Sequence, residues 1–142
     1  MADKILNNVA MIDGSYNNIA FLNTASTEVA VRLANILFKL TADQSIWFGG
    51  ELTFTNTIDN SSTENEGSIT NLVFKDQFDT TMFVYVNDSV TVTINDGTTT
   101  TPVADTDFTV TNVAGLLTIT FNATVTIPVG SIMAISFRGT KA

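Results

Sequence analysis

The stretch Ser89-Val-Thr-Val-Thr-Ile-Asn-Asp-Gly-Thr-Thr-Thr-Thr101 decides the fold of this chain. Its first half alternates apolar and hydroxyl side chains with a period of two, which is the pattern of a half-buried β-strand. Asn95-Asp-Gly97 then supplies the residue types that a tight hairpin turn needs. The stretch therefore predicts two antiparallel strands joined by a short turn.

The same alternation recurs along the chain, and groups of Gly, Asn, Asp and Pro separate the alternating runs. Thr and Asn dominate the composition, with 24 and 14 copies. Thr fits the surface of a pleated sheet, and Asn fits turns. No helical period persists, so the chain is expected to be all-β. Short strands at this spacing predict an antiparallel Greek-key β-sandwich, immunoglobulin-like, with about seven to nine strands.

The inward positions of the alternating runs define the expected core. Hydrophobic residues make up 44% of the 142 residues, and the chain has 10 Phe and no Cys, so packing must supply the stability that disulfides do not. The expected core residues are Phe38, Leu52, Phe54, Leu72, Phe74, Val84, Val90, Val92, Ile119, Phe121, Ile135 and Phe137.

The first 30 residues differ from the rest, because two short apolar runs, 9–12 and 19–22, flank a turn at 13–18. We expect residues 1–30 to form an N-terminal β arm or hairpin and residues 31–142 to form the sandwich. An arm of this kind adds a strand to the sheet edge of a neighbouring subunit. The alternative is a hairpin that folds back on its own sandwich. The expected anchors of the arm are Ile5, Leu6, Val9, Met11, Ile12, Ile19, Phe21 and Leu22.

The net charge of −8, with only six basic residues, disfavours nucleic acid and anionic membrane surfaces as partners. No run approaches the roughly 18 apolar residues of a membrane span, so membrane insertion is not expected. The N-terminal residues lack the basic and apolar regions of a signal peptide. We therefore expect a chain that is made without a signal peptide.

Catalysis is not expected, because the chain has no His and no Cys, and no Ser, Thr or Lys has an evident base beside it. Asp105 and Asp107 are more consistent with a solvated turn than with acid–base chemistry. Calcium at Asp76 and Asp79, or at Asp105 and Asp107, is the alternative, since carboxylate oxygens are calcium ligands. Their spacing fits no regular calcium loop, so no metal and no cofactor are expected.

Lys39 and Lys75 lie within apolar runs. The favoured interpretation is that each side chain lies along the sheet with its amine in water. The alternative is an isopeptide crosslink to an asparagine such as Asn122, in which a desolvated amine acts as the nucleophile. Trp47 has two interpretations as well, a carbohydrate-stacking platform and, more consistent with its size, a core or subunit-interface aromatic.

Between about residue 33 and residue 141, the expected strands and turns follow one another in a recognisable order. An apolar strand with a lysine precedes a Gly-Gly turn and a Thr-rich strand that ends in Asn, and a later strand ends in Asp. The chain in this region resembles the domain of unknown function eleven, a repeat of bacterial surface proteins. The matching segments are 36–40, 48–57, 69–76, 85–92, 116–121 and 128–137.

Relatives in this family occur as repeats of cell-surface proteins and in clostridial spore-appendage proteins. The resemblance therefore implies a structural subunit that self-assembles head-to-tail, as a homopolymer, into an extracellular or spore-surface filament. Unlike the surface repeats, this chain has a single repeat, with neither a signal peptide nor a wall anchor expected, and the sequence identifies no anchoring protein. The alternative function is a monomeric surface adhesion or glycan-binding module.

Overall fold

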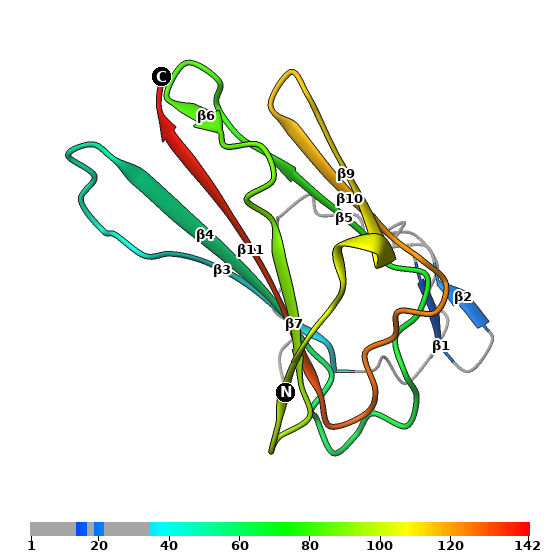
Figure 1. The fold of residues 1–142 in the computed structure, drawn as a ribbon. Helices are drawn as coiled ribbons and strands as arrows, with labels where there is room; N and C mark the ends of the chain where they lie inside the picture. The colour runs from blue at the N-terminus through cyan, green and yellow to red at the C-terminus, as the bar shows by residue number, and fades with distance from the viewer. Residues whose placement is uncertain (1–13, 17–18, 22–34) are drawn as a thin grey trace, which may run out of the picture.

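Nine strands form two antiparallel sheets that share one core (Figure 1) in the part of the computed structural model described here, residues 14–16, 19–21 and 35–142. The larger sheet has the order β3 (Leu37–Ala42), β4 (Glu51–Asp59), β11 (Ile132–Lys141), β7 (Thr91–Asn95) and β8 (Thr100–Pro102), and β6 (Phe83–Tyr85) pairs with the end of β11. The smaller sheet has the order β5 (Val73–Gln77), β10 (Leu116–Phe121) and β9 (Phe108–Val113).

The last strand, β11, lies in the middle of the larger sheet. Its Ile135 faces Asn56 of β4 on one side and Val92 of β7 on the other. The chain changes sheet between β4 and β5, between β5 and β6, between β8 and β9, and between β10 and β11. This connectivity confirms the predicted antiparallel Greek-key sandwich. Within the described residues no helix is long and apolar enough to cross a membrane.

The predicted core is confirmed with one exception. Phe38 and Phe54 are partly buried against the core, and Val84 is 49% exposed. The prediction for Val84 was wrong, because the pairing of β6 with β11 turns Phe83 and Tyr85 inward and leaves Val84 on the outer face. The buried members of the predicted set are Leu52, Leu72, Phe74, Val90, Val92, Ile119, Phe121, Ile135 and Phe137.

Phe83 is the centre of an aromatic cluster at the end of the sandwich where the chain ends. Its ring lies 4.9 Å from that of Phe78, 5.3 Å from Phe54 and 6.3 Å from Trp47, measured between centroids. Gly139 of β11 faces this ring, and a Cβ there would lie 1.9 Å from a Phe83 carbon. A glycine is therefore required opposite Phe83, and Trp47 is an aromatic residue packed against the core.

The predicted hairpin at Asn95-Asp-Gly97 is confirmed, since these residues join β7 to β8. The Asp96 carboxylate accepts hydrogen bonds from the backbone N–H of Thr99 at 2.7 Å and of Thr98 at 2.9 Å. These donors hold the pKa of Asp96 below its usual value. The turn is thus stabilised by the short polar side chains that made it recognisable in the sequence.

The described part of the arm is a hairpin of β1 (Gly14–Tyr16) and β2 (Ile19–Phe21). Ser15 forms a bridge with Thr70 just before β5, and its backbone N–H donates to the Thr70 carbonyl at 3.4 Å. For these six residues the structure agrees with the alternative of a hairpin on its own sandwich. The expected anchors Ile19 and Phe21 belong to β2, whereas Ile5, Leu6, Val9, Met11, Ile12 and Leu22 lie outside the described residues.

Candidate assembly edge

One side of the sandwich is bounded by two edge strands, β3 of the larger sheet and β5 of the smaller sheet. The two strands meet through Phe38 and Phe74, whose ring centroids are 6.3 Å apart. No described strand pairs with the outer side of β3. We call this region the β3/β5 side, defined by Phe38, Leu40, Phe74 and Asp76.

The pairing of β3 with β4 dictates which side chains of β3 turn inward. Phe38 lies opposite buried Ile58, and Leu40 lies opposite buried Asn56, so both point toward the core. Leu40 is nevertheless 47% exposed, although it lies on the inward face of its strand. A leucine that is turned inward and still reaches solvent marks an incompletely covered edge of the core.

The other edge strands are less open than β3. At the opposite edge of the larger sheet, β8 has only three residues and includes Pro102, which lacks a backbone donor. Short edge strands and edge prolines are the features that discourage strand addition. On β9, inward-facing Phe108 is buried and Val110 is half-buried. On β9 the exposed apolar residue, Val113, lies on the outer face, whereas β3 exposes the inward-facing Leu40.

Asn56 and Asp76 form a polar pair in the interior of this side. Asn56 is 1% exposed, and its Nδ2 has no hydrogen-bond partner among the described residues. Asp76 lies opposite fully buried Leu117, so its carboxyl faces inward. Burial raises the pKa of Asp76, and the nearby Asn56 amide offsets part of that rise. The amide thus approaches the carboxyl without forming a well-directed hydrogen bond.

A second buried asparagine, Asn60, has all its polar atoms bonded. Its Nδ2 donates to the carbonyls of Gly67 and Ile127, both at 3.0 Å, and its Oδ1 accepts from Asn65 at 2.8 Å. Asn65 in turn accepts from the Asn35 backbone N–H at 2.8 Å and donates to the Asn35 carbonyl at 3.3 Å. This network fixes the chain where it enters β3.

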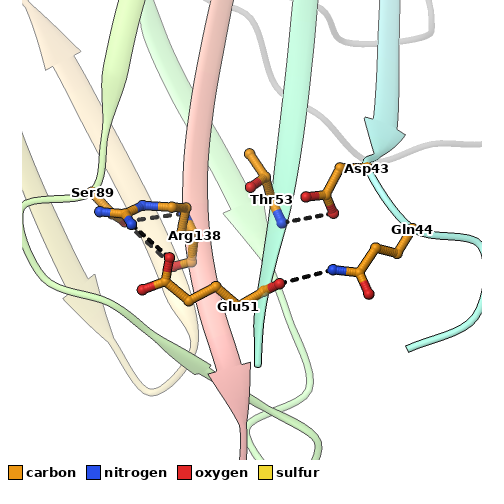
Figure 2. A network of polar contacts seen from close by, with 6 residues as sticks. All are labelled: Asp43, Gln44, Glu51, Thr53, Ser89 and Arg138. Carbon is orange, nitrogen blue, oxygen red and sulfur yellow. Dashed lines mark hydrogen bonds and ion pairs between the residues drawn. The ribbon is translucent and has the colours of Figure 1, made fainter. Parts of the chain in front are cut away.

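The other end of β3 is fixed by the polar network in Figure 2. Asp43 exchanges two hydrogen bonds with Thr53, each of 3.0 Å, and Gln44 donates to the Glu51 carbonyl at 2.9 Å. Glu51 pairs with Arg138 at 2.6 Å, but both side chains are half-exposed, so the ion pair contributes little stability. The backbone of Arg138 donates to the Ser89 hydroxyl at 3.0 Å. Both ends of β3 are thus fixed in position.

The residues proposed for an isopeptide crosslink are not brought together. Lys39 lies on β3 and Lys75 on β5, and both side chains are exposed. Asn122 is exposed as well, and its Nδ2 donates to the Thr106 carbonyl at 3.1 Å. The exposed position of both lysines is consistent with the favoured interpretation, in which each side chain lies along the sheet. The isopeptide crosslink stays a prediction.

The two aspartate pairs considered for calcium are differently placed. Asp76 faces the interior, whereas Asp79 is exposed and binds Thr81, whose hydroxyl and backbone N–H lower the Asp79 pKa. Asp105 and Asp107 begin and end the 3-10 helix η1 (Asp105–Asp107). Within residues 14–16, 19–21 and 35–142, no group of three or more acidic side chains is placed to hold a metal ion.

Asn56 and Asn60 were not among the residues predicted from the sequence, and Asp76 was considered only as a calcium ligand. A signal for Asn56 was present, since it follows Leu52 and Phe54 at the inward positions of one alternating strand. A polar residue in that series predicts a buried amide. Asp76 follows Phe74 in the same way.

No family model matches the chain, and no curated protein matches it, so the resemblance to the domain of unknown function eleven stays a prediction. A solved structure, the collagen binding domain of the Erysipelothrix rhusiopathiae surface protein RspB, is similar with a TM-score of 0.47 and 10% identity. The match covers 94% of this chain and 44% of the solved chain. At this level the likeness carries no argument about function.

Proposed function

We propose that this chain is a structural subunit that self-assembles head-to-tail into an extracellular or spore-surface filament. Subunits join when a strand of one adds to a sheet edge of the next. The supporting observation is β3, an edge strand without proline that exposes Leu37 and Leu40. Such an edge presents a row of backbone donors and acceptors to an incoming strand. The filament's location rests on the sequence resemblance described above.

The arm supplies the apolar residues that strand addition needs. Five of its expected anchors fall within residues 2–12, and each would contribute about 1.5–3 kcal/mol on burial, before the cost of ordering the segment. A contact between the arm of one copy and the edge of another joins two different surfaces. Repetition of such a contact gives an open filament rather than a closed ring.

A monomeric adhesion or glycan-binding module is the second candidate, and the loop between β3 and β4 favours it. Phe48 is 92% exposed there, next to Trp47 and Ile46. Exposed aromatic side chains on a loop at one end of a sandwich are typical of binding surfaces. In this reading the protein stays monomeric, and Phe48 contacts the ligand.

Negative-stain electron microscopy and size-exclusion chromatography with light scattering separate the two candidates. We expect the full chain to form filaments, and the chain without residues 2–12 to be a folded monomer. Phe48→Ser is the matched control, which should leave filaments unchanged. A full chain that stays monomeric at every concentration would refute the filament, as would filaments that persist after the deletion. Loss of binding to immobilised glycans in Phe48→Ser would favour the adhesion module.

A further inference from the structure

The β3/β5 side is built in two successive layers. In the first layer, Phe38 and Phe74 contact each other. Leu40 and Asp76 each follow two residues later on the same face of their strands, and the Asp76 carboxyl meets Asn56, which is opposite Leu40. An apolar layer therefore lies directly beside a layer that contains a carboxyl and an amide.

The second layer is incomplete among the described residues. Asn56 Nδ2 has no acceptor among the described residues, and Asp76 has no cationic partner among them. An unpaired buried donor and an uncompensated carboxylate are both unfavourable in a protein interior. Leu40 reaches solvent at the same level of the sandwich. The described residues supply neither a positive charge beside the Asp76 carboxyl nor an apolar side chain over Leu40.

We propose that the β3/β5 side is the docking site for the N-terminal arm of a second copy, with Lys4 of the arm paired to Asp76. This inference rests on the proposed function and specifies its contact. An ammonium at this point favours the ionised carboxylate, which has enough lone pairs to accept from both Lys4 and Asn56 Nδ2. Docking would therefore supply a counter-charge to Asp76 and an acceptor for the Asn56 amide, which the described residues do not provide.

The arm has the matching chemistry. Lys4 is the only basic residue among residues 1–30, and Ile5 and Leu6 follow it directly. In an extended strand Lys4 and Leu6 share one face. A strand that runs antiparallel to β3 brings Leu6 to the Phe38–Phe74 layer when Lys4 is level with Asp76. One strand thus offers the charge and the apolar group in the order that the two layers require.

The second copy is the occupant that the proposed head-to-tail assembly supplies. Leu40 is 47% exposed, so the described residues leave this part of the edge partly uncovered. The network of Asn35, Asn60 and Asn65 holds the start of β3 in place beside it.

Charge reversal in the full chain tests the pairing. Lys4→Asp and Asp76→Lys, each alone, should raise the lowest concentration that gives filaments by at least about tenfold. An equimolar mixture of these two variants should form filaments, because each arm then meets an edge of opposite charge. The double variant Lys4→Asp/Asp76→Lys should also assemble alone. Lys75→Asp and Asp105→Lys are the matched controls, since both positions are exposed, and they should behave as the unchanged chain does.

Folding is checked for each variant by circular dichroism and thermal unfolding. Asp76→Asn keeps the shape of the side chain, so it tests the loss of charge even if Asp76→Lys does not fold, and it too should weaken assembly about tenfold. If the unchanged chain forms filaments and the variants at 4 and 76 do so equally, this docking site is refuted and the filament stands. If the single variants fail and their mixture also fails, the pairing is not between copies and the inference is wrong. A chain that never assembles refutes both proposals.

Discussion

Replacing Asn60 by alanine tests the reasoning about the buried amides most directly. The substitution removes three hydrogen bonds, to the carbonyls of Gly67 and Ile127 and from Asn65. The backbone bonds of residue 60 to Ser131 and Gly130 remain. Each buried polar group that is left unpaired costs about 1–3 kcal/mol. The Ile127 carbonyl keeps its bond from the Ile69 N–H, so the Gly67 carbonyl and one donor of the Asn65 amide lose their partners. The expected loss is about 2–6 kcal/mol in the free energy of unfolding.

Urea unfolding followed by far-ultraviolet circular dichroism measures this loss. With a slope of about 2 kcal/mol per molar urea, the midpoint should fall by roughly 2 M. Asn122→Ala is the control, because Asn122 is exposed and makes a single bond to the Thr106 carbonyl, so we expect less than about 1 kcal/mol. If Asn60→Ala costs no more than Asn122→Ala, the buried network does not stabilise the fold and the reasoning fails.

Three further outcomes follow from the structure. Gly139→Ala places a Cβ against the Phe83 ring and should cost about 1–3 kcal/mol or more in thermal unfolding, whereas an unchanged melting temperature would show that the cluster yields easily. Asp76 has a folded-state pKa raised above its ordinary 3.8, so its contribution favours folding most at low pH and is lost as pH rises through the folded-state pKa. Asp76→Asn should therefore gain stability relative to the unchanged chain as pH rises from about 4 to neutrality, and a pH-independent difference between the two would contradict this. Leu40→Lys puts a cation beside Asp76 in the same chain and should block filaments by at least about tenfold in concentration while the fold is kept, and assembly as strong as that of the unchanged chain would exclude this edge.

The fold was predictable from the sequence because alternation and turn chemistry agree locally. The alternating run that contains Leu52 and Phe54 and the Asn95-Asp-Gly97 turn each carry their signal within a few residues, and the structure has a strand and a hairpin there. The prediction that Val84 is buried was wrong because its apolar run is short. Only the register against β11 decides which face of such a short strand turns inward. That register depends on Gly139, which admits the Phe83 ring and is far away in sequence.

The candidate site was less predictable, because its members come from strands that meet only in the folded sandwich. Lys39 and Lys75 were selected as candidates because their neighbours in the sequence are apolar. Both point outward, since each lies one position away from the residues of its strand that face the core. The same alternation, followed one residue further, places Leu40 and Asp76 inward. A polar residue at an inward position was therefore the better guide than a charged residue among apolar neighbours.

Asn56 in β4 and Asn60 just after β4 are both buried, but they affect the β3/β5 side in opposite ways. Asn60 is fully bonded and links the loop at 60–67, the start of β3 and the segment at Ile127. Asn56 keeps an unpaired donor beside a carboxyl whose pKa is raised by burial. The bonds of Asn60 and Asn65 hold the start of β3 in the position where Leu40 is partly exposed. If the stability provided by Asn60 were lost, the edge would be free to collapse, so Asn60→Ala should weaken assembly as well as folding.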